Sequence, residues 1–439
     1  MKNNYLTYIA LAFLFISCSE ERVFDSAIDQ EINMEELELF YQDILNEPSQ
    51  KESFQNVKRN PKKLYVHYMP WFHSKEVDGY WGQHWTMTNK NPDNIDVSGK
   101  REIASHYYPK IGPYSSNDTD LQKYHLLLMK LSGIDGVIFD WYGSRDIHDY
   151  KSIKDNTESF IEEIEEVGLE FAIMYEDRVA EYASDENNEV QQRVVSGIDA
   201  VTLDMQYIQS TYFTSDNYIR LNGREMLFTF GPHFITNPSD WESVFTNSDM
   251  KPDVYTLWKA SDRVGKCAGG EFSWIDKGHT ETLRGYYDYV RENNITAVGG
   301  AYGGFNHYYT EGGWSDSTYN NWTIPHNHTD TFKETLRMMD NEPVAFIQLL
   351  TWNDFGEGTM LEPTEEFGFD YLKEIQTYSG SVFKEHHLEL PYRLYQLKKK
   401  YGNNKRLNRI LDGLYKFIFT LELKKARRLL KKIRKYYPL

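Results

Sequence analysis

The sequence predicts a (β/α)8 TIM barrel, an α/β fold, and two observations support this prediction. Eight apolar segments of strand length follow one another over roughly 300 residues, and amphipathic segments of helical length separate most of them. Polar and aromatic residues follow most of these strands, as expected for a barrel whose site lies at the carboxyl ends of its strands. The predicted strands are 64–69, 136–141, 170–175, 225–230, 254–258, 271–275, 296–301 and 344–350.

The predicted helices lie between strands, where an amphipathic pattern places apolar side chains on one face. The fifth and sixth strands are an exception, because a Gly-rich loop without a clear helical pattern joins them. After the last strand, a helix near residues 365–378 would close the barrel. The helices predicted between strands are 120–131, 157–167, 190–209, 280–293 and 329–340.

Four regions are predicted along the chain. Residues 1–18 form a signal peptide, and residues 19–60 form a polar, acidic tether with a possible helix at 34–45. Residues 61–385 form the barrel, and residues 386–439 form a short basic helical extension.

The N-terminus has the pattern of a secretion signal. Lys2 precedes an apolar run at 5–16 that is too short for a comfortable membrane span. The residues leading to Cys18 resemble the lipobox of bacterial lipoproteins, with Phe15 in place of the more usual Leu. The acidic segment 19–21 resembles the export tag of Bacteroidetes surface lipoproteins. We therefore expect lipidation of Cys18 and anchoring in the outer membrane, with cleavage and secretion as the alternative.

Composition narrows the class of substrate. Aromatic residues make up 15% of the 439 residues, a surplus that fits a site lined with flat faces for sugar rings. Residues 393–439 hold 16 Lys and Arg against two acids, so the rest of the chain has a net charge of −32. Such an acidic body repels phosphates, which argues against a nucleic-acid substrate and is compatible with a neutral polymer.

Two further expectations follow from the residue content. Cys18 and Cys267 form no disulfide framework, and the sequence has no zinc-ligand spacing, so we expect no metal or other cofactor. We also expect a monomeric chain. The basic extension fits either a helical cap on the acidic barrel or a surface that contacts an anionic membrane.

The strongest candidate for catalysis is the segment 348–359. It begins as a buried strand and breaks into a Gly-punctuated loop that carries Asp354 and Glu357. Hydrolysis of an acetal requires one acid that stays protonated and one that stays charged, and two close carboxylates supply this pair. An ordinary acidic turn is the alternative, but its place after the eighth strand of a barrel favours catalysis.

Other candidate residues follow the predicted strands or lie within the last loop. Because the carboxyl ends of all strands meet at one face, these side chains are expected to stack on sugar rings or to hold hydroxyl groups. They are Tyr68, Trp71, His84, Trp141, Glu176, Arg178, Tyr302, Asn306, Trp352 and Asn353.

Several motifs together resemble the clan that contains glycoside hydrolase families 71 and 99. They are the segments 67–71, 111–116, 133–142 and 352–363, and the resemblance extends over about residues 63–380. Family 99 implies endo-acting, retaining cleavage of α-mannosides without a metal in the acid/base step. Carried over, Asp354 takes the position of the base that acts on the sugar 2-hydroxyl, and Glu357 that of the general acid/base.

The catalytic loop departs from family 99 at two positions. Asp354 stands where that family has Glu, and Gly356 stands where a His is usual. An Asp-x-x-Glu pair resembles family 71 instead, whose members are inverting α-1,3-glucanases. An inverting enzyme needs carboxyl groups roughly 6.5–9.5 Å apart, and a shorter first acid would widen the gap. The alternatives are therefore an inverting α-1,3-glucanase-like hydrolase, a non-catalytic glycan-binding lipoprotein, or a role in building or trimming a surface polysaccharide.

Overall fold

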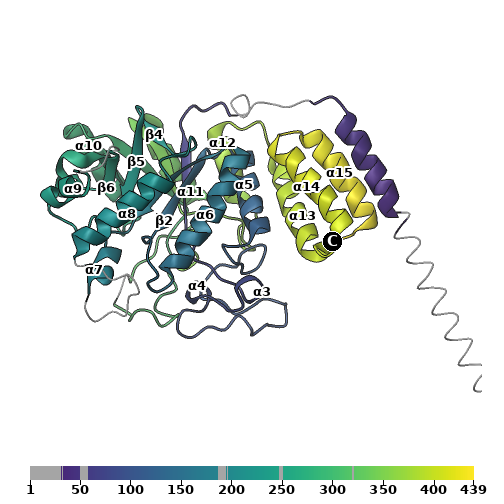
Figure 1. Cartoon of the computed structure of the whole chain (residues 1–439), viewed down its shortest axis with the longest axis horizontal. Coiled ribbons are helices and arrows are strands. Elements are labelled where there is room, and N and C mark those ends of the chain that lie inside the picture. The colour runs from purple at the N-terminus through teal and green to yellow at the C-terminus, as the bar shows by residue number, and fades with distance from the viewer. Residues whose placement is uncertain are drawn as a thin grey trace, which may run out of the picture. The chain divides into compact units, whose positions relative to one another are not determined.

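The computed structural model describes residues 31, 33–49, 58–185, 194, 196–246, 251–318 and 321–439 (Figure 1). The predicted signal peptide and Cys18 lie outside these residues, as does part of the predicted tether. None of the helices in the described ranges is both long enough and apolar enough to cross a membrane.

Eight parallel strands close into a barrel, which confirms the predicted (β/α)8 fold. Each strand pairs with the next, and β9 pairs with β1 through the partners Leu64 and Ile347. A two-residue strand, β4 (Arg220–Leu221), pairs antiparallel with β5 outside this ring. The barrel strands are β1 (Leu64–Tyr68), β2 (Gly136–Trp141), β3 (Glu170–Tyr175), β5 (Arg224–Thr229), β6 (Asp253–Leu257), β7 (Ala268–Phe272), β8 (Ala297–Tyr302) and β9 (Val344–Leu350).

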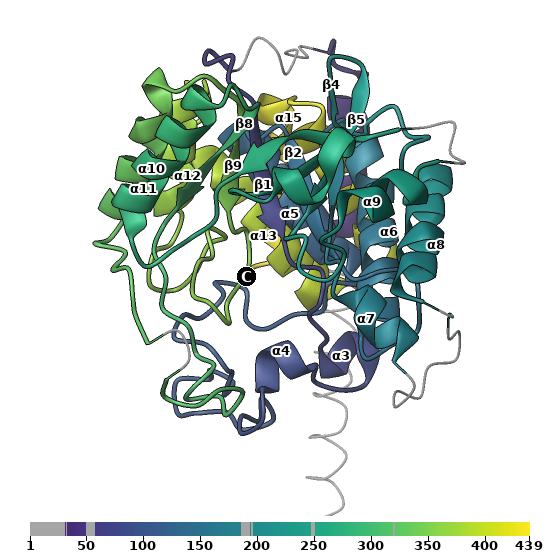
Figure 2. The same ribbon diagram turned by 90° about the vertical axis from the view of Figure 1, so that its left-hand side faces the viewer.

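Helices surround the sheet, with α10 and α11 on one flank and α6 and α8 on the other (Figure 2). Two short 3₁₀ segments, η1 (Ser261–Arg263) and η2 (Gly265–Cys267), join β6 to β7, where the sequence shows no clear helix. The helix α9, between β5 and β6, was not predicted. The helices of the barrel are α3 (Lys75–Asp78), α4 (Gln83–Thr86), α5 (Thr119–Ser132), α6 (Tyr150–Val167), α7 (Val179–Ser184), α8 (Gly197–Thr211), α9 (Pro238–Val244), α10 (His279–Glu292), α11 (Asp330–Met338) followed by η3 (Met339–Asn341), and α12 (Asp370–Ser379).

Side chains alternate between the inside of the barrel and the surrounding helices. On β2, Phe139 packs against Phe160 of α6 with ring centroids 5.4 Å apart, so it points outward. On β1, His67 contacts Trp274, which follows β7, with ring centroids 4.9 Å apart, so it points inward. Because successive residues of a strand point to opposite faces, this alternation decides which strand-end residues reach the site.

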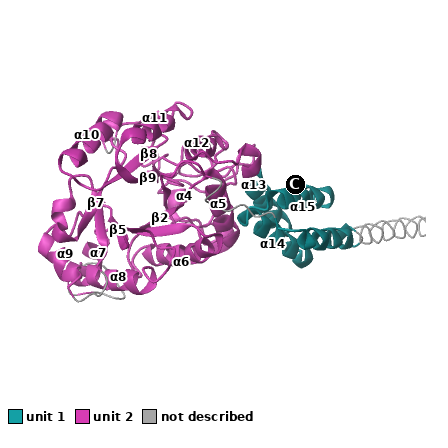
Figure 3. Cartoon of the chain, turned by 90° about the horizontal axis from the view of Figure 1, so that it is seen from above, with its two compact units in different colours: residues 1–54, 389–439 teal, residues 55–388 magenta. Residues whose placement is uncertain are grey.

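The chain folds as two compact units (Figure 3). The barrel unit spans residues 55–388. The helical unit combines residues 1–54 with residues 389–439, so the N-terminal segment and the basic extension belong to one unit. The sequence alone gave no sign of this pairing.

The helical unit contains the helical residues 33–46, most of α13 (Glu385–Tyr401), and the helices α14 (Lys405–Phe419) and α15 (Leu423–Tyr436). Leu37, Ile44, Leu411 and Ile433 are fully buried in its core. Such burial stabilises the unit by roughly 1.5–3 kcal/mol for each large aliphatic side chain.

Charge pairs add to this packing, because the basic C-terminal helices face an acidic N-terminal helix. Arg406 forks onto Glu38 with nitrogen–oxygen distances of 2.9 and 2.7 Å. Arg428 pairs with Glu47 at 2.7 Å, and Lys432 pairs with Glu36.

Candidate active site

The loop that follows β9 is held closed by its own hydrogen bonds. The Thr351 amide donates to the Thr359 carbonyl over 3.1 Å, and the hydroxyl groups of these two residues lie 3.0 Å apart. Inside this ring, the Asp354 amide donates to Thr351 Oγ1 over 2.8 Å. The two acids therefore lie on a short loop whose ends are fastened to each other.

The two carboxylates are positioned by backbone groups and by the loop after β8. Asp354 Oδ1 accepts a 2.9 Å hydrogen bond from the Glu357 amide, which fixes the direction of the Asp354 side chain. The Glu357 carbonyl accepts from the Asn306 amide over 2.9 Å, and Tyr309 Oη lies 3.4 Å from Glu357 Oε1. Residues from two strand-end loops thus hold the acid pair.

The surroundings separate the pKa values of the pair. Loss of water, together with the negative charges of Asp354 and Asp140, raises the pKa of Glu357 to about 8. Burial also raises the pKa of Asp354, to about 6, but hydrogen bonds from the Glu357 and Gly356 amides oppose this shift. Near pH 7 Glu357 therefore carries a proton while Asp354 is mostly ionised, which is the division that acid/base chemistry requires.

Two more carboxylates lie near this pair. Asp140, at the end of β2, is 4% exposed, and burial raises its pKa to about 7 despite a hydrogen bond with Tyr142. Glu176 directly follows β3, and burial together with the charge of Asp140 raises its pKa well above the usual range. Glu176 was among the predicted site residues, whereas Asp140 was not. The signal for Asp140 was the alternation of β2, which places the residue before Trp141 on the inner face.

Three of the predicted site residues pack against helices and are not brought to the acid cluster, namely Trp141, Tyr68 and Tyr302. Trp141 stacks with Tyr207 of α8 at 6.1 Å between ring centroids. Tyr68 Oη lies 3.1 Å from Nδ1 of His125, and its ring packs on Phe160. Each of them is the last residue of its strand and points outward by the alternation described above.

Tyr302, the last residue of β8, follows the same pattern. Its hydroxyl lies 2.9 Å from Nδ1 of His279 at the start of α10, and its amide donates to Thr335 Oγ1 of α11. The side chain is fully buried. Tyr302 therefore packs the barrel wall and is not exposed to substrate.

Trp352 and Asn353 lie at the base of the loop that follows β9, and both are fully buried. Asn353 Oδ1 accepts from the Met69 amide over 2.8 Å, and its Nδ2 donates to the Met69 carbonyl over 3.0 Å. Trp352 packs edge-on against His125, with ring centroids 5.3 Å apart. These residues support the loop from below and do not face sugar hydroxyls.

Other predicted residues do lie at the barrel mouth. Trp71 stacks flat on His84, with ring centroids 4.1 Å apart and an angle of 5° between the rings. Arg178 is exposed, and its charge lowers the pKa of the neighbouring Glu176. Asn306 is partly exposed next to the catalytic loop. Arg178, Asn306 and the exposed part of His84 are available to bind hydroxyl groups or ring faces. Trp71, in contrast, is only 8% exposed and packs beneath His84.

The barrel mouth also holds an aromatic residue, Trp274, that was not predicted. Trp274 is partly exposed, and its ring meets His67 at 4.9 Å and Phe230 at 4.8 Å between centroids. The predicted strand 271–275 included Trp274, but β7 ends at Phe272, so Trp274 is a strand-end residue. Within the described ranges, no three His, Cys, Asp or Glu side chains are grouped to hold a metal ion.

Comparisons with known proteins agree with this architecture. Residues 60–254 match the model of Glycosyl hydrolase family 99. The chain is 23% identical over 198 residues to the glycoprotein endo-alpha-1,2-mannosidase of Xenopus laevis, covering 42% of this chain and 41% of that one. A glycoprotein endo-alpha-1,2-mannosidase-like protein of Mus musculus is 24% identical over 200 residues, covering 42% and 40%. The chain therefore matches about two fifths of the length of these relatives.

Two solved structures share the fold. The family 99 endo-alpha-mannosidase from Bacteroides thetaiotaomicron superposes with a TM-score of 0.55 at 18% identity, covering 72% of this chain and 96% of that one. A glycoside hydrolase-like protein superposes with a TM-score of 0.53 at 14% identity, covering 77% and 99%. The matched family segment ends at residue 254, before the loop that carries Asp354 and Glu357.

Proposed function

We propose that this chain, a relative of glycoside hydrolase family 99, is an endo-acting α-glycoside hydrolase that cleaves a polysaccharide. The observation that carries this proposal is the acid pair in the loop after β9, with Glu357 protonated and Asp354 ionised near pH 7. An α-mannan-type substrate is the first candidate, because the matched relatives are a glycoprotein endo-alpha-1,2-mannosidase and an endo-alpha-1,2-mannosidase-like protein.

In this proposal Glu357 is the general acid. Its proton passes to the glycosidic oxygen as the bond to the anomeric carbon breaks, which prevents expulsion of an alkoxide. The resulting Glu357 carboxylate is stabilised by the Tyr309 hydroxyl at 3.4 Å. In a retaining route it then takes a proton from the water that completes hydrolysis, which restores the acid for the next cycle.

Asp354 acts as the base. The Glu357 amide holds its carboxylate in a fixed direction. In the retaining route that the family resemblance implies, Asp354 removes the proton of the sugar 2-hydroxyl, whose oxygen attacks the anomeric carbon and forms a transient epoxide. Water then opens the epoxide at the anomeric carbon, and Asp354 returns the proton to the 2-oxygen. In an inverting route Asp354 would instead activate a water molecule, for which its short side chain leaves room.

The test is digestion of an α-mannan and of an α-1,3-glucan by wild type and by Glu357→Gln. We expect wild type to release oligosaccharides from the α-mannan and Glu357→Gln to be slower by about 100-fold or more. Proton NMR of the first-formed anomer then distinguishes retention from inversion. If wild type binds oligosaccharides and releases nothing from either polymer, the chain is a glycan-binding protein and the proposed activity is wrong.

We also propose that the chain is a monomer anchored to the outer membrane through lipid on Cys18. The sequence around Cys18 supports this proposal, since it resembles a lipobox. Labelling of cells with an alkynyl fatty acid should mark wild type but not Cys18→Ala, and light scattering of the lipid-free chain should give the mass of one copy. An unlabelled wild-type protein would mean simple secretion.

A further inference from the structure

A cavity of about 520 Å³ lies beside the barrel mouth, between the segment 73–83 and the start of α6. Its size falls within the range of about 300–1,000 Å³ that is common for small-molecule sites. We propose that this cavity is a distal subsite that binds a neutral hexose unit of the same glycan chain that Glu357 cleaves. This proposal rests on the proposed function.

A row of rings connects the catalytic acid to the cavity. Tyr309, whose hydroxyl is 3.4 Å from Glu357, stacks with Trp314 at 6.0 Å between centroids. Trp314 meets His84 at 5.5 Å, and His84 Nε2 lies 3.3 Å from Asp149, which lines the cavity. Trp314 is 40% exposed, so part of this row is open to a ligand.

A second series of rings starts from the same residues and reaches another wall of the cavity. Trp71, stacked on His84, contacts Tyr142 at 6.5 Å, and Tyr142 stacks with Tyr150 at 5.2 Å. Tyr150 in turn contacts His148, which lines the cavity, at 5.5 Å. Flat side chains that follow one another in space suit a chain of sugar rings, because the apolar face of each sugar ring stacks on an aromatic face.

The cavity also offers polar groups for sugar hydroxyls. His73 lines it, is only 4% exposed, and its Nε2 has no hydrogen-bond partner among the residues that the structure describes. Gln83 donates to Asp149 over 2.8 Å, which leaves its amide oxygen available as an acceptor. A buried unpaired nitrogen costs free energy unless a bound group satisfies it.

The charges around the cavity define the class of ligand. Asp146, Asp149 and Asp155 line it together with a single cationic side chain, Lys151, which already pairs with Asp155. Burial lowers the pKa of His73, so this ring is neutral at pH 7. Such a lining repels uronate, sulfate or phosphate groups and accepts neutral hydroxyl-rich rings.

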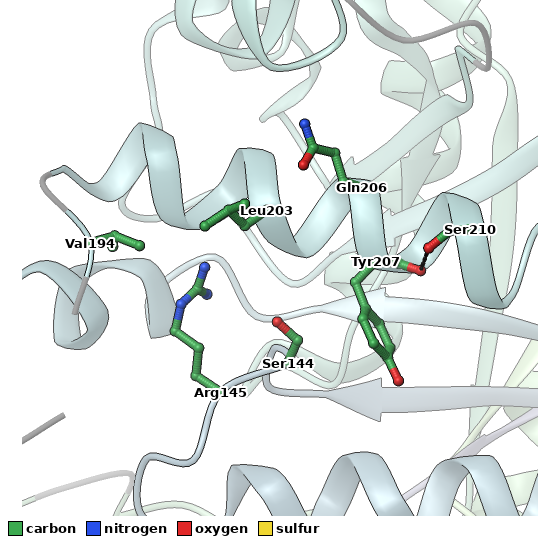
Figure 4. A pocket seen from close by; sticks show the side chains of 7 residues that line it. All are labelled: Ser144, Arg145, Val194, Leu203, Gln206, Tyr207 and Ser210. Atoms are coloured by element: carbon green, nitrogen blue, oxygen red, sulfur yellow. Dashed lines mark hydrogen bonds between the residues drawn. The ribbon is translucent and has the colours of Figure 1, made fainter. Parts of the chain in front are cut away.

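A second cavity supplies a matched control. It has a volume of about 480 Å³, and Ser144, Arg145, Leu203, Gln206 and Tyr207 contribute to its lining (Figure 4). Arg145 there is committed to Asp204 at 3.0 Å and to the Ala200 carbonyl at 3.1 Å. This cavity lies on α8, the helix against which Trp141 packs, and no row of exposed rings joins it to Glu357 within the described residues.

The experiment compares kcat/KM for a series of linear α-mannan oligosaccharides from the shortest one cleaved upward. The test variant is Tyr80→Ala with Asp146→Ala, two cavity residues whose side chains are exposed, and the control is Gln206→Ala. For wild type and for the control, kcat/KM should rise when the chain becomes long enough to reach the cavity. For the test variant, the ratio of long-chain to short-chain kcat/KM should fall about tenfold, the effect of one lost stacked ring or hydrogen bond.

The outcomes separate the two proposals. Equal losses on short and long chains, or no loss at all, would overturn the distal subsite while leaving the hydrolase intact. Failure of wild type to cleave any α-mannan or α-1,3-glucan oligosaccharide would overturn the proposed function itself. In that case, calorimetric titration of the same oligosaccharides into wild type and the test variant decides whether the cavity binds sugar, and equal affinities would overturn the subsite.

Discussion

In the barrel mouth Glu357 lies near other carboxylates and is largely shielded from water, whereas in the helical unit Glu38 faces Arg406 at 2.7 Å. Burial, together with the charges of Asp354 and Asp140, raises the pKa of Glu357 to about 8, while the hydrogen bonds from Arg406 lower the pKa of Glu38. The same type of carboxyl group therefore holds a proton in the barrel unit and forms a surface ion pair in the helical unit. The difference lies in the neighbours, because both side chains are chemically identical.

The largest expected effect comes from removing the charge of Asp354. We expect Asp354→Asn to lower kcat by about 100- to 10,000-fold, since the base is lost and the pKa of Glu357 falls without its neighbour. Release of reducing ends measures the rate, and the thermal midpoint serves as the control for folding. A near-wild-type rate would show that another group is the base.

The barrel cluster also predicts the pH dependence of kcat/KM. Asp354 must be ionised, so activity rises with pH through its pKa of about 6. Glu357 must be protonated, so activity falls as pH rises through its pKa of about 8. Asp140→Asn removes a negative charge near Glu357 and should move the alkaline limb to lower pH.

The control for this pH profile is Asp412→Asn, a change in the helical unit that should leave both limbs in place. An alkaline limb unchanged by Asp140→Asn would mean that Asp140 does not influence the proton of Glu357.

In the helical unit, a steric change should matter more than a charge change. A Cβ at Gly413 would lie 2.1 Å from the Tyr41 hydroxyl, so Gly413→Leu forces the Tyr41 ring out of its place. We expect a loss of roughly 1–3 kcal/mol in the unfolding free energy of this unit, measured by denaturant unfolding. Hydrolysis rates should stay at the wild-type level, and a parallel loss of activity would show that the barrel depends on this packing.

The smallest effect is expected for the ion pairs of the helical unit. Arg406→Ala removes the exposed fork onto Glu38, and we expect a small fall in thermal midpoint that disappears at high salt. Differential scanning calorimetry at low and high salt measures it. A large loss that persists at high salt would indicate that the Arg406 side chain contributes by packing.

The barrel and its last loop could be predicted because hydrophobic periodicity and the order of elements along the chain carry that information. Trp141 and Tyr68 were predicted as site residues, although the inward-facing residues are their neighbours Asp140 and His67. The sequence does not show which of two successive strand-end residues faces inward, because that choice depends on packing against particular helices. Trp274 was missed for a related reason, since its strand ends three residues earlier than predicted.

The association of the N-terminal helix with the basic extension could not be predicted from local pattern. Residues 33–46 and α15 are separated by the whole barrel in sequence, and only the folded chain brings Glu47 to Arg428. Each segment alone is an amphipathic helix with many equivalent partners.

The side chain of Asn353 exchanges two hydrogen bonds with the backbone of Met69, as one peptide group does with another in an antiparallel sheet. These bonds continue the pairing between the two neighbouring segments beyond the ends of β1 and β9. The loop that carries Asp354 and Glu357 is therefore fastened to the barrel wall. In the proposed reaction, little reorganisation free energy is then required when substrate arrives, because the proposed proton donor and base are already held in place.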